Sequence, residues 1–72
     1  MVVNFDVVQL NGDRVSDMSV YADAISDILF DVTDEEDVTI CETGFALHRV
    51  LTLNELLEIE QKLVALGLVV KA

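Results

Sequence analysis

The segment from Thr52 to Gly67 constrains the fold most, because it carries the signals of a complete helix. Thr52, followed three residues later by Glu55, predicts a capping box, and Gly67 suits the left-handed position that often ends a helix. The apolar side of this helix covers nearly half the circumference, so it must pack against a sheet or another helix. The residues of the apolar side are Leu53, Leu56, Leu57, Ile59, Leu63, Val64 and Leu66.

The N-terminal part of the chain predicts a hairpin followed by a helix. Residues 2–10 are rich in β-branched and aromatic side chains, which is typical of a strand. Asn11-Gly12 favours a two-residue type I′ turn, so a second short strand is expected at residues 14–18. Ser19 is the expected N-cap of a helix in which apolar residues recur at helical spacing from Val20 onward.

The middle of the chain predicts a second hairpin. Residues 38–42 and 45–51 read as strands joined at Thr43-Gly44, and a two-residue turn places Ile40 opposite Leu47. One face of this hairpin is apolar and should face the core. The other face is an outer sheet face or an oligomer contact, and it carries Thr39, Cys41, Thr43, Ala46, His48 and Val50.

These elements predict one α+β domain that spans residues 1–72. The expected architecture is a small two-layer sandwich, in which an antiparallel sheet of about four strands carries two helices on one face. The hairpin signals favour the order ββαββα. The alternative is the βαββαβ order of a ferredoxin-like domain, which requires residues 14–18 to be loop and residues 68–71 to be an edge strand.

Charge and composition exclude several classes of function. A net charge of −10 on 72 residues repels phosphate and anionic lipid, so neither direct nucleic-acid binding nor membrane-surface binding is expected. No apolar run reaches the roughly 18 residues needed to span a bilayer. Cys41 is the only cysteine, which excludes an intrachain disulfide and fits a cytoplasmic location. A basic protein is the natural partner for such a chain.

The stretch from residue 23 to residue 37 holds seven of the fourteen acidic residues and no basic residue. Asp23, Asp27 and Asp31 recur every four residues on the polar side of the predicted helix, where like charges repel by roughly 0.2 to 0.5 kcal/mol per pair. The acids after Asp31 stand near the negative end of the helix dipole. The candidate partner-binding residues are Asp23, Asp27, Phe30, Asp31, Asp34, Glu35, Glu36 and Asp37.

Phe30 and the spacing of the aspartates make this stretch more specific than a solubilising charge run, which is the alternative. Phe30 lies on the polar side of the helical wheel, and an exposed aromatic among carboxylates is typical of an interface hot spot. Four residues of helix rise about 6 Å, whereas one DNA strand advances about 3.4 Å per phosphate. One aspartate per turn therefore matches roughly every second phosphate, which is compatible with mimicry of DNA.

The other reactive residues favour neither catalysis nor metal binding. Cys41 and His48 are diagonal neighbours in the predicted register, but no orienting carboxylate or oxyanion donor accompanies them. The sequence contains no glycine-rich phosphate loop. The acids from Asp31 to Asp37 do not have the spacing of a calcium-binding loop. We therefore expect no enzymatic activity, no cofactor and no metal site.

The sequence thus predicts a small acidic interaction protein, not an enzyme, that binds a basic surface of a partner protein. The expected effect is to inhibit or modulate a partner that binds nucleic acid. The alternative is a homo-oligomer, such as a homodimer, with the acidic residues serving solubility alone. Glu60 lies inside the apolar side of the predicted C-terminal helix, so it needs solvent or a cation, with Arg49 and Lys62 as the candidates.

Overall fold

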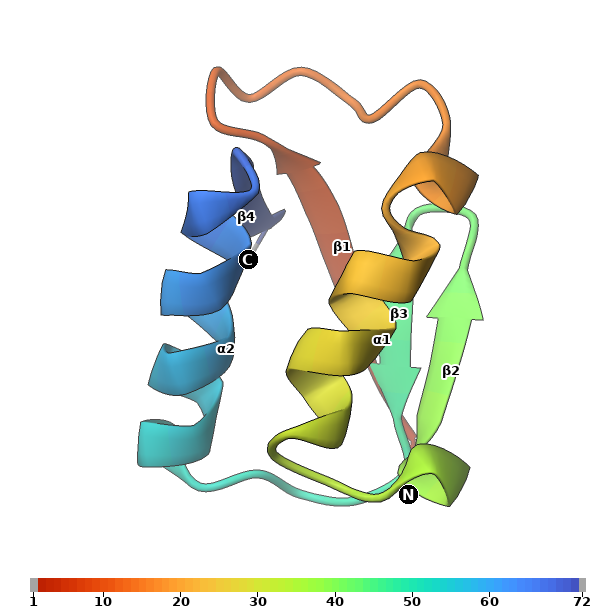
Figure 1. Cartoon of the computed structure of the whole chain (residues 1–72), viewed down its shortest axis with the longest axis vertical. Coiled ribbons are helices and arrows are strands. Elements are labelled where there is room, and N and C mark those ends of the chain that lie inside the picture. Colours follow the sequence, from red (N-terminus) through yellow and green to blue (C-terminus); the bar gives the residue numbers. More distant parts are fainter. Residues whose placement is uncertain (1, 72) are drawn as a thin grey trace.

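The computed structural model describes residues 2–71 and contains a four-stranded antiparallel sheet with two helices on one face (Figure 1). The fold class predicted from the sequence is therefore confirmed. The order of strands across the sheet is β2-β3-β1-β4. In chain order the elements are β1 (Val3–Gln9), the 3-10 turn η1 (Met18–Val20), α1 (Ala22–Phe30), the 3-10 turn η2 (Glu35–Asp37), β2 (Val38–Cys41), β3 (Gly44–Leu47), α2 (Leu53–Ala65) and β4 (Leu68–Lys71).

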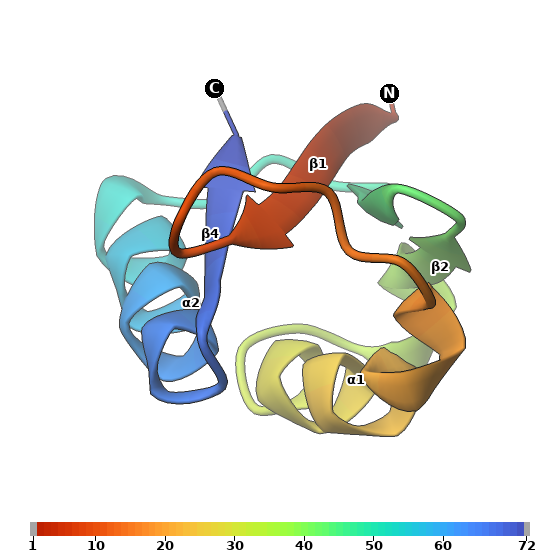
Figure 2. The ribbon, with the colours of Figure 1, turned by 90° about the horizontal axis from the view of Figure 1, so that it is seen from above.

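The order of helices and strands is βαββαβ, the alternative that the sequence offered. β1 and β3 form the centre of the sheet, and β2 and β4 form its edges. Each helix connects two parallel strands that are separated by a third strand, which is the ferredoxin-like arrangement. Figure 2 shows both helices on the same side of the sheet, with α2 next to the edge strand β4.

The turn predicted at Asn11-Gly12 forms, but with a different geometry. Gly12 has a φ of +89°, and in residues 2–71 every residue with a positive φ is a glycine. The Gln9 amide donates to the Asp13 carbonyl at 2.9 Å, and the Gly12 amide donates to the Gln9 carbonyl at 2.9 Å. This is a three-residue loop that ends in a left-handed glycine, not the predicted type I′ turn.

The strand predicted at residues 14–18 does not form. Beyond the turn, the described residues on its two sides pair at a single isolated bridge, between Val8 and Arg14. Further pairing is blocked because β3 and its preceding turn already occupy this edge of β1, where the Val7 amide donates to the Thr43 carbonyl at 2.8 Å. The chain therefore leaves the sheet and crosses to α1 as a loop.

The hairpin of β2 and β3 is displaced by two residues from its predicted register. Ile40 lies opposite Phe45, not opposite Leu47. Because the displacement is an even number of residues, each side chain keeps the face that was predicted for it. β3 ends at Leu47, so residues 48–51 of the predicted strand form the connection to α2.

The core lies between the sheet and the helices. Phe5 and Phe45 stack across the central strands, with ring centroids 5.1 Å apart and an interplanar angle of 25°. The helices contribute two fully buried side chains each. The buried residues of this core are Val7, Met18, Ile25, Leu29, Phe45, Leu47, Ile59, Leu63 and Leu68.

The helix termini are explained by their capping residues. Thr52 Oγ1 accepts from the Glu55 amide, and the Glu55 carboxylate accepts from the Thr52 amide at 2.9 Å, so the predicted capping box of α2 is confirmed. Gly67 follows α2 with a φ of +81°. α1 begins later than predicted because η1 precedes it, and the cap of η1 is Asp17, whose carboxylate accepts from the Ser19 amide at 3.1 Å.

Candidate functional site

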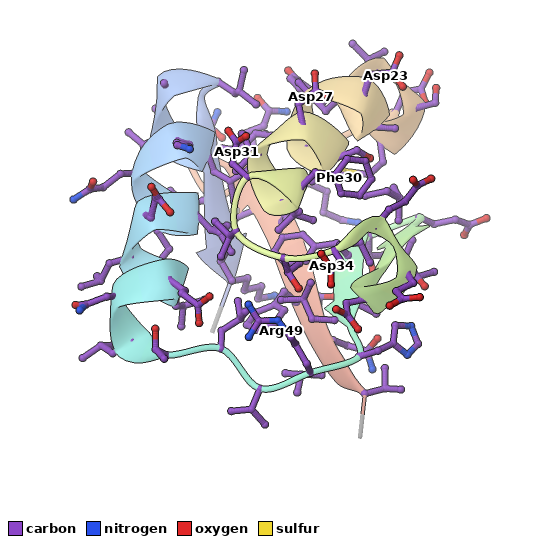
Figure 3. The ribbon with its side chains drawn as sticks, turned by 60° about the horizontal axis from the view of Figure 1, so that its bottom comes forward. Asp23, Asp27, Phe30, Asp31, Asp34 and Arg49 are labelled. Atoms are coloured by element: carbon purple, nitrogen blue, oxygen red, sulfur yellow. The ribbon has the colours of Figure 1, made fainter. Side chains whose placement is uncertain are left out.

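α1 presents its aspartates to solvent. Burial of Ile25 and Leu29 fixes the rotation of the helix, so Asp23 and Asp27 lie on its exposed side (Figure 3). Neither carboxylate makes an ion pair within residues 2–71. The two charges are one helical turn apart and repel each other without a compensating cation.

The acidic residues continue from α1 into η2. Asp34, Glu35 and Glu36 are consecutive and exposed, with Asp34 at the N-cap of η2. In the described part of the chain no cation pairs with any of them. Asp37 differs, because it is half-buried and its carboxylate accepts from Thr33 Oγ1 at 3.2 Å. Asp37 therefore helps to hold the turn.

Phe30 is the aromatic residue of this region. It is the last residue of α1 and is 42% exposed, as its position on the polar side of the helical wheel predicted. Its ring is not among the partly buried side chains that pack against the core. Figure 3 shows it on the side of α1 that faces η2. We name as the acidic surface the residues Asp23, Asp27, Phe30, Asp31, Asp34, Glu35, Glu36 and Asp37.

Arg49 relieves the electrostatic strain that the sequence indicates at the C-terminal end of α1. Its Nη2 donates to the Val32 carbonyl at 3.1 Å, and its Nε donates to Thr33 Oγ1 at 2.6 Å. The same guanidinium pairs with Glu55 at the start of α2, with 2.7 Å between Nη2 and Oε2. A cation at a helix C-terminus is stabilised by the helix dipole. Sequence reasoning missed this contact, because it considered Arg49 as a partner for Glu60.

Lys62 ties α2 to the end of α1. Its Nζ lies 3.2 Å from Asp31 Oδ2 and 3.9 Å from Glu58 Oε1. Asp31 is thus the one residue of the acidic surface that makes an ion pair within residues 2–71. Both candidate cations for Glu60, Arg49 and Lys62, have other partners, and Glu60 makes no ion pair in the described residues.

Two carboxyl groups have a perturbed pKa. Hydrogen bonds from the Thr52 amide and, to a smaller extent, from the Arg49 guanidinium hold the pKa of Glu55 below its ordinary value of 4.5. The Ser19 hydroxyl, at 2.6 Å, and then the Ser19 amide hold the pKa of Asp17 below its ordinary value of 3.8. Both groups cap the start of a helical element, and neither belongs to the acidic surface.

Cys41 and His48 do not form a pair. The displaced register places Cys41 opposite Gly44, so the predicted diagonal contact with His48 is wrong. The Cys41 thiol lies 3.8 Å from the Thr39 carbonyl, and His48 Nε2 lies 3.0 Å from Thr39 Oγ1. Both side chains therefore contact Thr39, one at its carbonyl and the other at its hydroxyl, and not each other.

A second concave region lies between the loop that precedes α1 and the turn that joins β2 to β3. It is an open hollow of about 540 Å³ whose lining includes the apolar residues Val15, Met18 and Ile40. Arg14 lines both this hollow and an adjoining one of about 230 Å³. Since the sequence predicted a strand at residues 14–18, it gave no indication of this hollow.

The remaining observations concern metal binding, membranes and related proteins. No group of three or more metal-ligating side chains in residues 2–71 is arranged to hold an ion. Within the same residues, neither helix is long and apolar enough to cross a membrane. Comparison with protein-family models, curated proteins and solved structures returned no match.

Proposed function

We propose that this protein binds a basic surface of a partner protein through its acidic surface. The observation that carries the proposal is that five neighbouring acids remain exposed and without an ion pair in the described residues, beside an exposed aromatic ring. Lys62 pairs with Asp31 in the middle of the acidic surface, and Arg49 bonds to the Val32 carbonyl and to Glu55, so the acids on either side of Asp31 stay uncompensated. The five acids are Asp23, Asp27, Asp34, Glu35 and Glu36.

The charge selects the kind of partner. With a net charge of −10, the chain repels phosphates, so the complementary surface is a patch of Lys and Arg on another protein. Phe30 supplies the apolar contact that a surface of carboxylates otherwise does not offer. In this proposal the protein is a non-enzymatic binding protein of the cytoplasm, where the thiol of Cys41 stays reduced.

A partner that handles nucleic acid is the most specific form of this proposal. Its groove for phosphates is already lined with Lys and Arg, which is the surface that carboxylates complement. Asp23 and Asp27 follow each other by about 6 Å along the helix axis, close to the advance of two phosphates along one DNA strand. By occupying the groove, the protein would inhibit the partner or modulate its binding to DNA.

The test is capture of partners from lysate by the immobilised protein at low and at high salt, followed by affinity measurements with the captured protein. Asp23→Asn combined with Asp27→Asn should weaken binding about tenfold or more, because two exposed charges are removed without breaking an internal contact. The matched control is Asp13→Asn combined with Glu42→Gln, which removes the same charge from other exposed positions. Equal losses for both double variants, or no loss for the first, would contradict the proposal.

DNA competition tests the more specific form. If the acidic surface occupies a phosphate-binding groove, a DNA duplex should displace the protein from its partner, and the partner should bind DNA less tightly in its presence. Displacement should require more DNA when the acidic surface is intact than when Asp23 and Asp27 are replaced. Simultaneous binding of DNA and this protein to the partner would exclude mimicry while leaving the basic-partner proposal in place.

A further inference from the structure

β2 is one edge of the sheet, and no strand of residues 2–71 lies beyond it (Figure 1). The His48 amide donates to the Asp37 carbonyl at 2.9 Å, which fixes the phase of the antiparallel ladder between β2 and β3. Thr39 and Cys41 therefore bond to β3, whereas Ile40 directs both its amide and its carbonyl away from β3. The edge thus offers a donor and an acceptor at one residue, which is what a further strand needs for pairing.

The segment that precedes β2 is acidic, and its backbone is held in place. The Val38 amide donates to the Glu35 carbonyl. The Asp37 carboxylate accepts from Thr33 Oγ1 at 3.2 Å. The carboxylates of residues 34–36 stay exposed and make no ion pair within residues 2–71. Because the backbone that carries them is already ordered beside the start of the open edge, a partner that binds them loses little further entropy in ordering this segment.

The two ends of β2 differ in charge. At the η2 end, Arg49 bonds to Thr33 but pairs with Glu55 at 2.7 Å, so the charge of the exposed acids stays uncompensated. At the other end, two hollows beside the turn from β2 to β3 are lined by cations and acids together. Their charged residues are Asp6, Arg14, Asp17, Glu42 and Lys71. The excess of negative charge along the edge is therefore concentrated at the η2 end, where Lys or Arg side chains fit best.

We propose that an extended segment of the partner, rich in Lys and Arg, adds to the sheet as a strand along β2. This inference rests on the proposed function and specifies the form of the basic partner. Backbone hydrogen bonds to Ile40 hold the added strand, and its cations face the acids of residues 34–36. β2 contains four residues, which span about 14 Å, so the affinity depends on both the hydrogen bonds and the charges. A second copy, with a net charge of −10, is repelled from the same edge.

NMR titration with the synthetic peptide Lys-Lys-Val-Thr-Val-Thr-Lys-Lys tests the pairing. Its central residues match the length of β2, and lysines at both ends serve either strand direction. The control peptide has proline at the four central positions, so it keeps the charge but has no central amide to donate. The first peptide should bind with a Kd at least about tenfold lower than the control. Equal affinities of the two peptides would overturn the strand pairing and leave the basic-partner proposal in place.

Amide hydrogen exchange shows where the peptide binds. In the protein alone, the Ile40 amide should be less protected than the Thr39 and Cys41 amides, which bond to β3. A saturating amount of the first peptide should slow exchange at Ile40 about tenfold or more, and the proline peptide should change it little. Binding of the first peptide without slower exchange at Ile40 would overturn the inference. Slower exchange that comes from raising the protein concentration alone would place a second copy on this edge and would also overturn it.

Charge variants separate this inference from the proposed function. Glu35→Gln with Glu36→Gln removes two charges beside β2 and should weaken binding of the first peptide about tenfold. The matched control, Asp13→Asn with Glu58→Gln, removes the same charge from other exposed positions and should weaken it much less. Equal losses for the two double variants would overturn the inference. If neither peptide binds, the inference also fails, and capture of partners from lysate alone then decides the proposed function.

Discussion

Gly44 lies opposite Asp6, where the backbone of β1 leaves no room for a side chain on β3. A Cβ atom added at this position would overlap the Phe5 carbonyl oxygen and lie 3.1 Å from the Asp6 Cα. Both neighbours are backbone atoms of a paired strand, so neither can rotate away. We expect Gly44→Ala to destabilise the fold by about 3 kcal/mol, measured as the free energy of unfolding in urea.

Gly12→Ala is the control for the loss of a glycine as such. Nothing lies within 4 Å of a Cβ at this position, and only its φ of +89° opposes the substitution. The expected cost is about 1 kcal/mol. A Gly44→Ala variant no less stable than Gly12→Ala would contradict the close approach of β1 and β3.

Single residues differ in how far the sequence predicts their surroundings. The exposure of Phe30 follows from helical periodicity, which depends only on its neighbours along the chain. The contacts of Arg49 with Val32 and Thr33 join residues 17 and 16 positions apart. No local sequence pattern predicts contacts between residues so far apart in the chain. The contact of Arg49 with the C-terminal end of α1 could therefore be found only in the structure.

The same distinction applies to whole elements. α2 was predicted correctly because the capping box at Thr52 and the glycine at Gly67 are local signals that agree with the apolar period. The strand at residues 14–18 was predicted wrongly because the signal at Asn11-Gly12 specifies a turn but not the conformation of the residues after it. Pairing between β1 and β3 took the edge that this strand needed.

The link between α1 and α2 gives an element-level prediction about pH. The pKa of Glu55 is lower in the folded state than its ordinary value of 4.5, because the Thr52 amide and Arg49 stabilise the carboxylate. The ionised group therefore contributes stability above pH 4.5, and this contribution is lost as the pH falls through the lower folded pKa. Glu55→Gln should be less stable than the wild type at neutral pH.

Urea unfolding of both proteins at a series of pH values checks this sign. The difference in unfolding free energy should shrink as the pH falls below about 4.5 and should approach the small effect of an uncharged capping box at low pH. Glu58→Gln, whose carboxylate lies 3.9 Å from Lys62, is the control and should show a weaker dependence. A constant difference across the range would mean that the charge of Glu55 does not link the helices.

At the scale of the whole molecule, charge is distributed unevenly. The acidic surface occupies α1 and η2, whereas Arg49 and Lys62, which approach it, lie before and within α2. The sequence located the acidic residues, since a charge run is visible without a fold. It could not place the cations beside them, because Arg49 and Lys62 lie far from the acids along the chain.

This distribution predicts how salt acts on stability. Asp27 lies one helical turn from Asp23 and has no ion pair in the described residues, so Asp27→Asn should stabilise the fold by roughly 0.3 kcal/mol at about 0.01 M salt. Asp23 is kept, because the helix dipole stabilises a carboxylate in the first turn of α1. The gain should nearly vanish at about 1 M salt, where the Debye length falls to roughly 3 Å. Thermal unfolding at both salt concentrations measures it, at a protein concentration low enough to keep the chain monomeric. Glu42→Gln changes the net charge equally at another exposed position, so an equal gain in that control would attribute the effect to total charge instead of the crowding on α1.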